Sequence, residues 1–112
     1  MSDFDAIVVG AGCAGSVAAY TLASAGKSVL VVERGQYAGA KNMTGGRIYT
    51  HSLKKVFPNY QEAPLQRKVT HERISLMSPD SNFTIDFASD DLLKDGQESY
   101  TVLRGPFDQW LA

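Results

Sequence analysis

The chain has 112 residues, enough for one domain at most, and its 11 basic and 12 acidic residues give a formal net charge of −1 at pH 7. No basic run or stripe stands out, which argues against nucleic acid as a partner. The single cysteine, Cys13, cannot form an intrachain disulfide, and no apolar run has the length of a membrane span, so we expect a cytoplasmic location and no transmembrane segment.

The first 34 residues have the order of a dinucleotide-binding βαβ unit. A strand is expected over residues 6–9, a helix of small residues over 14–25, and a second strand over 28–32. Gly26 follows the helix, at a position where a left-handed backbone often ends helices. The predicted fold class is therefore α/β, with a Rossmann-like FAD- or NAD(P)-binding βαβ unit.

Three glycines between the first strand and the helix each have a physical task. Gly10 lets the chain turn sharply, Gly12 lets the backbone approach a pyrophosphate, and Gly15 lets the helix lie close to the strand. The phosphates would then lie at the helix N-terminus, beside Cys13 and Ala14, because unpaired N–H groups there favour an anion. The alternative is that the glycines serve turning and packing alone, with Cys13 as a small apolar filler.

An acidic residue, Glu33, ends the second strand. Its carboxylate falls where it can accept hydrogen bonds from the adenosine ribose hydroxyls, and an acid there disfavours a 2′-phosphate, so NADP is a poor candidate. Arg34 beside it keeps this exclusion from being absolute. Since strand, glycines, helix and acid agree in order and spacing, nucleotide binding is favoured over a purely structural role of the glycines.

A glycine-rich loop and a short helix are expected over residues 35–66. The second glycine-rich stretch of the chain, residues 39–47, lies in this loop. The helix is expected over 50–57, because its apolar residues fall on one side and Pro58 follows its end.

The pattern then changes to alternating residues. Residues 67–104 are expected to hold a β-hairpin, with strands over 69–77 and 83–87, followed by a short strand over 100–104. We expect the hairpin to be an insertion that covers a bound cofactor. Residues 105–112 are expected to begin a helix, and because a parallel sheet needs further crossovers, we expect the domain to be truncated.

Several motifs together resemble one family. They are the first glycine string, the ending Val-Val-Glu-Arg-Gly of the second strand, Gly-Ala-Lys-Asn-Met-Thr-Gly-Gly-Arg over 39–47, and Tyr-Thr-Val-Leu-Arg over 100–104 followed by Phe-Asp-Gln-Trp-Leu. The chain resembles the first part of FixC-type flavoproteins, relatives of electron-transfer-flavoprotein:quinone oxidoreductase. This resemblance implies bound FAD and electron transfer from an electron-transfer flavoprotein toward a ferredoxin-like protein or quinone.

The resemblance also implies where FAD would be held. The glycines of the first string would meet the pyrophosphate and Glu33 the adenosine ribose, while Gly45 and Gly46 would approach the flavin end. Arg104 would contact the phosphates or ribityl chain, or else pair with a nearby acid, and Arg47 would contact a phosphate or the flavin, or else be a solvated cation. The expected cofactor-binding residues are Gly10, Gly12, Cys13, Ala14, Gly15, Glu33, Arg34, Gly45, Gly46, Arg47 and Arg104.

Two other functions stay open from the sequence. An NAD-dependent dehydrogenase domain would predict another βαβ unit soon after Glu33. A non-catalytic remnant or interaction module would keep the fold without the flavin. No residue is expected to act as a catalytic acid, base or nucleophile, and His51 and His71 lie in no metal-like cluster. Redox chemistry in such proteins belongs to the flavin, and a chain that holds only the adenosine half of the cofactor is not expected to be active by itself.

Overall fold

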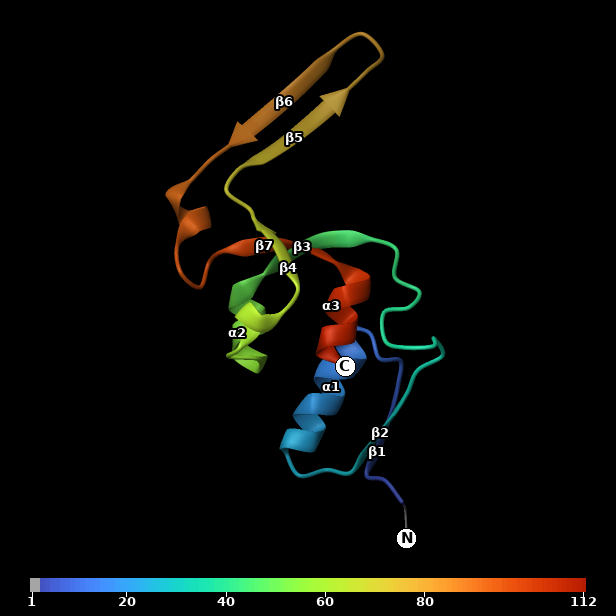
Figure 1. Cartoon of the computed structure of the whole chain (residues 1–112). Helices are drawn as coiled ribbons and strands as arrows, with labels where there is room; N and C mark the ends of the chain where they lie inside the picture. Colours follow the sequence, from blue (N-terminus) through green and yellow to red (C-terminus); the bar gives the residue numbers. More distant parts are fainter. Residues whose placement is uncertain (1–2) are drawn as a thin grey trace.

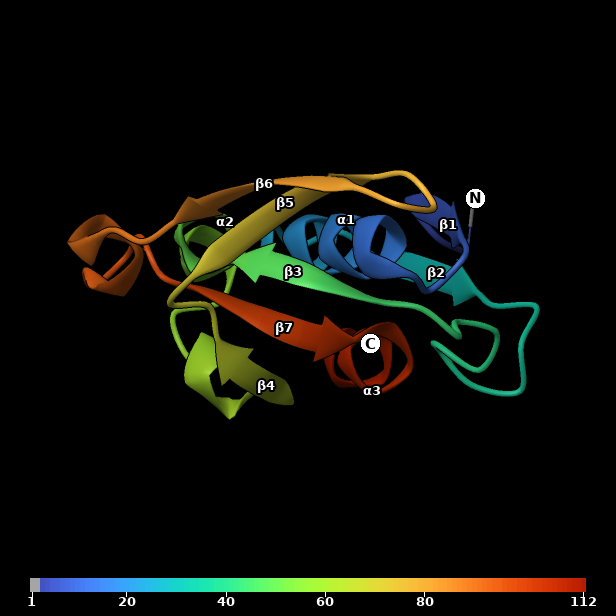
Figure 2. The same cartoon turned by 90° about the horizontal axis from the view of Figure 1, so that it is seen from above.

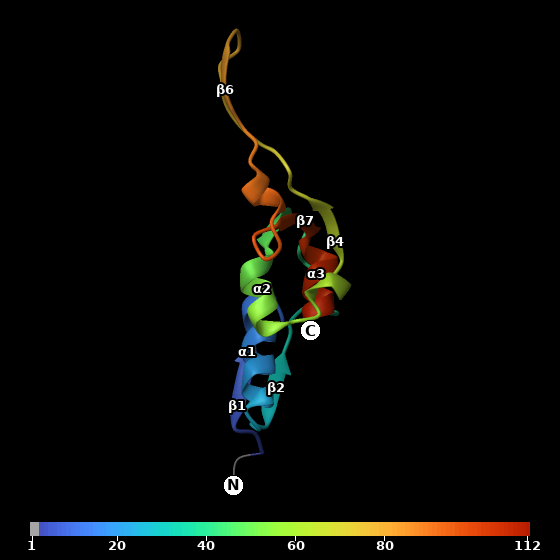
Figure 3. The same ribbon diagram turned by 90° about the vertical axis from the view of Figure 1, so that its left-hand side faces the viewer.

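The computed structural model describes residues 3–112. The chain forms an elongated molecule of 65 × 34 × 18 Å. A βαβ unit lies at one end, a three-stranded sheet with its helices lies in the middle, and a β-hairpin extends from the other end (Figures 1 and 3).

The N-terminal βαβ unit has the predicted order. Strand β1 (Ala6–Val9) pairs in parallel with β2 (Val29–Val32), and helix α1 (Cys13–Ser24) connects them. Gly26 follows the helix with φ of +77°, the left-handed region that favours glycine. Its N–H donates to the carbonyl of Ala23 at 2.9 Å, so the backbone itself closes the last turn. The predicted bounds are correct to within one residue.

A three-stranded antiparallel sheet forms the middle of the molecule. Its strands are β3 (Gly45–Tyr49), β4 (Leu65–Lys68) and β7 (Ser99–Leu103), in the spatial order β3-β7-β4 (Figure 2). The prediction of a loop at Gly45 and Gly46 was wrong, because these glycines begin β3. Glycine has low strand propensity, so pairing with β7 decides the conformation here.

Two helices flank this sheet. Helix α2 (Thr50–Val56) matches the expected helix over 50–57. Helix α3 (Arg104–Leu111) begins at Arg104, which was expected to end a strand, and its third residue is Pro106. Proline is tolerated there because first-turn N–H groups lack helical partners. The short 3₁₀ turns are η1 (Tyr60–Glu62) and η2 (Asp90–Leu93). No helix in the described part of the chain has the length and apolarity needed to cross a bilayer.

The apolar core lies between the central sheet, α2 and α3. Its buried apolar residues are Leu53, Tyr60, Ala63, Val102 and Phe107. Aromatic rings extend this core toward the βαβ unit: the Phe57 ring centroid lies 5.7 Å from that of Trp110 and 4.8 Å from that of Tyr20 on α1. The βαβ unit is thus joined to the core through Phe57 at the end of α2, which contacts both Tyr20 of α1 and Trp110 of α3.

The strand expected over 69–77 begins three residues later in the structure, and a strand that was not expected lies before it. β4 precedes it, and β5 (Glu72–Met77) pairs antiparallel with β6 (Asn82–Phe87) to form the hairpin. Residues opposite one another on one face of the hairpin are apolar, and all four are more than half exposed: Ile74, Leu76, Phe83 and Ile85. The hairpin projects away from the βαβ unit and does not cover it in this structure (Figures 1 and 3).

Candidate functional site

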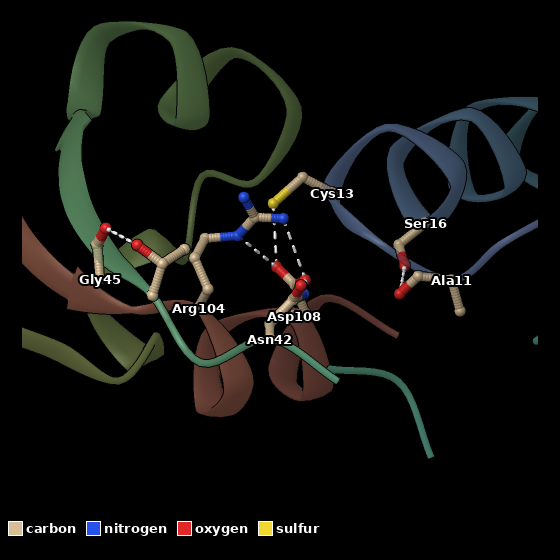
Figure 4. A network of polar contacts seen from close by, with 8 residues as sticks. Ala11, Cys13, Ser16, Asn42, Gly45, Arg104 and Asp108 are labelled. Carbon is tan, nitrogen blue, oxygen red and sulfur yellow. Dashed lines mark hydrogen bonds and ion pairs between the residues drawn. The ribbon is translucent and has the colours of Figure 1, made fainter. Parts of the chain in front are cut away.

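The glycine loop joins β1 to α1. Gly10 has φ of +98°, and its N–H donates to the carbonyl of Val32 at 2.7 Å. A Cβ at Gly15 would lie 1.8 Å from the carbonyl oxygen of Gly10, so any other residue would push the helix from the strand. The hydroxyl of Ser16 donates to the carbonyl of Ala11 at 3.3 Å and fixes the loop (Figure 4). Turning and packing within the chain explain Gly10 and Gly15.

Gly12 has no such explanation. Its φ of −79° and ψ of −172° are open to most residues. Within the described residues, a Cβ there would meet nothing closer than the Oδ2 of Asp108 at 4.0 Å, an ordinary contact. Gly12 is the N-cap of α1, and Cys13 and Ala14 are the first helical residues, whose N–H groups have no partner within the helix. The missing side chain therefore leaves space at a helix N-terminus, where an anion is favoured.

Glu33 is tied to the glycine loop. Its Oε1 accepts a hydrogen bond from the N–H of Gly35 at 2.6 Å, and its Oε2 accepts one from the N–H of Ala11 at 2.8 Å. These two bonds hold the pKa of the Glu33 carboxyl below its ordinary value. The exposed carboxylate is therefore charged at neutral pH, and each oxygen has a second lone pair for a ribose hydroxyl. Arg34, next in the chain, is exposed.

A buried carboxylate, Asp108 on α3, joins three segments of the chain (Figure 4). Its Oδ1 accepts hydrogen bonds from Cys13 Sγ and Arg104 Nε, both at 3.0 Å. Its Oδ2 accepts from Arg104 Nη2 at 3.1 Å and from the amide of Asn42. These contacts link the start of α1, the start of α3 and the loop before β3, and the four residues are called the Asp108 cluster below.

The Asp108 cluster sets the charges at the start of α1. Burial raises the pKa of Asp108, but the hydrogen bonds from Arg104 and Cys13 outweigh this, and the pKa lies below its ordinary value. The hydrogen bond to Asp108 likewise raises the pKa of Arg104. Burial first, and then Asp108, raise the pKa of Cys13 to about 11. Cys13 is thus a neutral thiol that donates to a charged carboxylate, and the filler interpretation was incomplete.

The second glycine-rich stretch crosses the start of α3. Gly39 has φ of +84°, and a Cβ there would lie 2.3 Å from the carbonyl oxygen of Gly105. The N–H of Asn42 donates to the carbonyl of Gly39 at 2.9 Å, which closes a turn and directs the Asn42 side chain toward Asp108. Two glycines that meet backbone to backbone therefore bring this loop within hydrogen-bonding distance of α3.

Gly45 and Gly46 lie along β3 rather than in a loop. A Cβ at Gly45 would come to 3.0 Å from the carbonyl oxygen of Val102, so pairing with β7 is tight at this position. A Cβ at Gly46 would have nothing within 4 Å among the residues described. Gly46 resembles Gly12 in this respect, because packing inside the chain does not require a glycine there.

Arg47 lies at the base of the hairpin. Its Nε donates to Ser99 Oγ at 2.7 Å, and its Nη1 pairs with Glu72 Oε1 at 2.5 Å. Its guanidinium carbon lies 4.6 Å from the centroid of the Tyr49 ring, a cation–π distance. The arginine is therefore a paired, partly buried group that connects β3, β7 and β5, and the solvated-cation alternative does not describe it.

The structure divides the expected residues into two groups. Gly10, Gly12, Cys13, Ala14, Gly15, Glu33 and Arg104 surround the glycine loop, whereas Gly45, Gly46 and Arg47 follow β3. The residues expected from the sequence to bind the cofactor did not include Asp108 or Asn42. The spacing of Arg104 and Asp108, four residues apart, is a helical signal that could have found the first, but Arg104 was assigned to a strand. Among residues 3–112, no three potential ligands are grouped as a metal site requires.

Comparison with known proteins decides the family. Residues 5–104 match the family described as FAD dependent oxidoreductase. The chain belongs to this family. It is 54% identical to Protein FixC of Escherichia coli O157:H7 over 109 residues, which are 96% of this chain and 26% of that protein. The described part of the chain continues after β2 into a loop and an antiparallel sheet, with no second βαβ unit, so topology and family both argue against the NAD-dehydrogenase alternative.

Two further relatives of Escherichia coli (strain K12) carry names that mention electron transfer. The chain is 54% identical to the probable electron transfer flavoprotein-quinone oxidoreductase YdiS over 114 residues, covering 99% of this chain and 27% of that protein. It is 48% identical to the probable electron transfer flavoprotein-quinone oxidoreductase YgcN over 110 residues, covering 97% of this chain and 25% of that protein. The chain thus spans about a quarter of the length of the curated relatives it matches.

Proposed function

We propose that this chain supplies the binding site for the ADP part of FAD in a flavin-dependent oxidoreductase. The observation that carries the proposal is Gly12. Nothing inside the described chain requires a glycine there, yet Gly12 is the N-cap of α1, whose first N–H groups have no partner within the helix. A ligand whose phosphates approach the backbone closely accounts for this space, and family membership supports FAD as that ligand.

Each residue around the loop has a defined part in this proposal. Backbone N–H groups of Gly12, Cys13 and Ala14 would donate to the pyrophosphate. Glu33 would accept hydrogen bonds from the ribose hydroxyls, and its charge would disfavour a 2′-phosphate. Arg104 would face the phosphates from the opposite side. These side chains and N–H groups bind and orient, and FAD when bound supplies the redox chemistry.

The flavin end of the cofactor is placed along β3 in this proposal. The open space at Gly46 supports a close approach of a flat ring or its ribityl chain to the backbone there. Gly45 precedes it on the same strand and pairs with Leu103, next to Arg104. No residue of the chain is assigned as a catalytic acid or base.

The electron partners are proposed from the names of the longer relatives. Because two relatives are named as probable electron transfer flavoprotein-quinone oxidoreductases, we propose that the complete protein receives electrons from an electron-transfer flavoprotein and passes them to a quinone or a ferredoxin-like protein. In this proposal the chain supplies part of the cofactor-binding site of such a protein.

Retention of flavin by the purified chain tests the proposal. The protein is mixed with FAD, desalted, and examined by visible absorption for flavin bands that remain with it. We expect retained flavin, and we expect ADP to displace it while 2′,5′-ADP displaces it poorly because of Glu33. A folded chain that binds neither FAD nor ADP would contradict the proposal and favour a non-catalytic remnant.

A further inference from the structure

We propose that Asp108 is a positioning residue, which holds the Arg104 guanidinium so that one edge faces a phosphate group at the start of α1. This inference rests on the proposed function, because it concerns the same pyrophosphate. Asp108 itself would not touch the cofactor, since it has no exposed surface.

The geometry of the pair fixes the direction of the guanidinium. Arg104 Nε and Nη2 donate to the two oxygens of Asp108 at 3.0 and 3.1 Å, a bidentate arrangement that leaves the planar group little rotation. The third nitrogen, Nη1, takes no part in this bidentate pair and points away from Asp108 (Figure 4). The Arg104 side chain is 36% exposed, so part of it can be reached by a ligand, and in this proposal that part is the outer edge of the guanidinium.

The charge balance requires that Asp108 be fully paired. The Oδ2 of Asp108 would lie 4.0 Å from a Cβ added at Gly12, and an unpaired carboxylate so close to the site would repel a bound pyrophosphate. Here the carboxylate is satisfied by Arg104, Cys13 and Asn42, so the ion pair adds no net charge, and its positive side is the side that faces outward. Asp108 thereby orients a cation toward the site without adding a competing anion.

The other two donors explain why the carboxylate itself stays in place. Cys13 is the first residue of α1, so its hydrogen bond fixes Asp108 relative to the N–H groups that would meet the phosphates. Asn42 comes from the loop before β3 and holds that loop on the same carboxylate. Asp108 therefore sets the spacing between the guanidinium and the helix N-terminus.

Binding of ADP and of adenosine by the Asp108→Asn variant tests this role. ADP carries the phosphates and adenosine does not, so a positioning role predicts a loss of ADP affinity of about tenfold or more with adenosine affinity unchanged. Arg104→Gln should show the same selective loss, and the double variant should lose no more than Arg104→Gln alone. Arg73→Gln is the matched control, because this exposed arginine pairs with Asp86 on the hairpin and should change neither affinity.

A ligand-free measurement separates this inference from the proposed function. In the NMR spectrum of the wild-type chain, the Nε–H of Arg104 should give a sharp signal protected from exchange, and Asp108→Asn should broaden or remove it. A signal equally sharp in both proteins, or equal losses of ADP and adenosine affinity, would overturn the positioning role. If the wild type binds no ADP, the proposed function fails, and the phosphate-facing role of Arg104 fails with it whatever the NMR signal shows.

If Asp108→Asn does not fold, the milder variant Asn42→Ala tests the same role. Asn42→Ala removes one donor to Asp108 and keeps the pair with Arg104. It should weaken ADP binding by less than Asp108→Asn and again leave adenosine binding unchanged. An Asn42→Ala variant that loses both ligands equally would contradict the positioning role.

Discussion

Glu33 at the end of β2 accepts a hydrogen bond from the N–H of Ala11 at 2.8 Å, across 22 positions of sequence. The contact closes the glycine loop onto the second strand. It also orients the carboxylate that would receive the ribose before any ligand arrives, which reduces the ordering cost of binding. One side chain thus serves both the fold and the proposed site.

Replacing Glu33 by glutamine should make stability less dependent on pH. The folded-state pKa of Glu33 lies below its unfolded value of 4.5, so its stabilising contribution is complete above about pH 4.5 and is lost as pH falls through the folded-state pKa. The difference in free energy of unfolding between wild type and Glu33→Gln should therefore shrink as the solution is acidified below that value. Urea unfolding at several pH values measures it, and a constant difference would contradict the assignment.

Alanine at Gly12 should affect ligand binding, whereas alanine at Gly15 should affect stability. Gly12→Ala should leave the melting temperature close to that of the wild type and reduce ADP affinity by about tenfold or more, because its Cβ occupies ligand space. Gly15→Ala should destabilise the chain by roughly 3 kcal/mol or more, because its Cβ meets the Gly10 carbonyl. Thermal unfolding and calorimetric titration distinguish the two, and a Gly12→Ala chain that binds ADP normally would remove the main support for the proposed function.

Cys13 should react slowly with alkylating reagents. Its pKa of about 11, against an ordinary value of 9.0, reduces the thiolate fraction near pH 8 by about a hundredfold. Since the chain has one cysteine, mass spectrometry after iodoacetamide treatment reports on this thiol alone. Asp108→Asn should speed the reaction, because the carboxylate that opposes ionisation is gone. Equal rates in the two proteins would show that Asp108 does not affect the thiol.

The apolar face of the hairpin should govern the solubility of the chain. Phe83 and Ile85 are 63% and 54% exposed, and threonine at both positions keeps a residue suited to strands while removing apolar surface. The double variant should bind less of the dye ANS and scatter less light at equal concentration. Ser75→Thr on the polar face is the matched control and should change neither signal.

Local patterns were sufficient for the βαβ unit and for α2. Gly10, Gly15 and Gly26 act within a few residues of their own positions, so their spacing predicts the turns they make. The strands of the central sheet were a different case. Gly45 becomes a strand residue because it pairs with Leu103, and that partner lies too far along the chain for any local pattern to reveal.

The candidate site, like the fold, was predictable from the sequence only where local patterns determine it. Glu33 and the glycines follow from order and spacing, whereas the environment of Arg104 depended on where a strand gives way to a helix. Beginning α3 at Arg104 places it one turn from Asp108, and burial of that acid depends on contacts with Asn42 and Cys13. Such a tertiary network leaves no periodic signal in the sequence.

The hydrogen bond between Cys13 and Asp108 spans 95 positions of the chain. During synthesis the βαβ unit emerges from the ribosome before α3. The N-terminus of α1 therefore lacks its contact with the Asp108 carboxylate until α3 has been made. Closing so long a loop costs entropy that is recovered only when α3 docks. We therefore expect the Asp108 cluster to form late in folding, after the central sheet, whereas the glycine loop is held earlier by contacts within the βαβ unit.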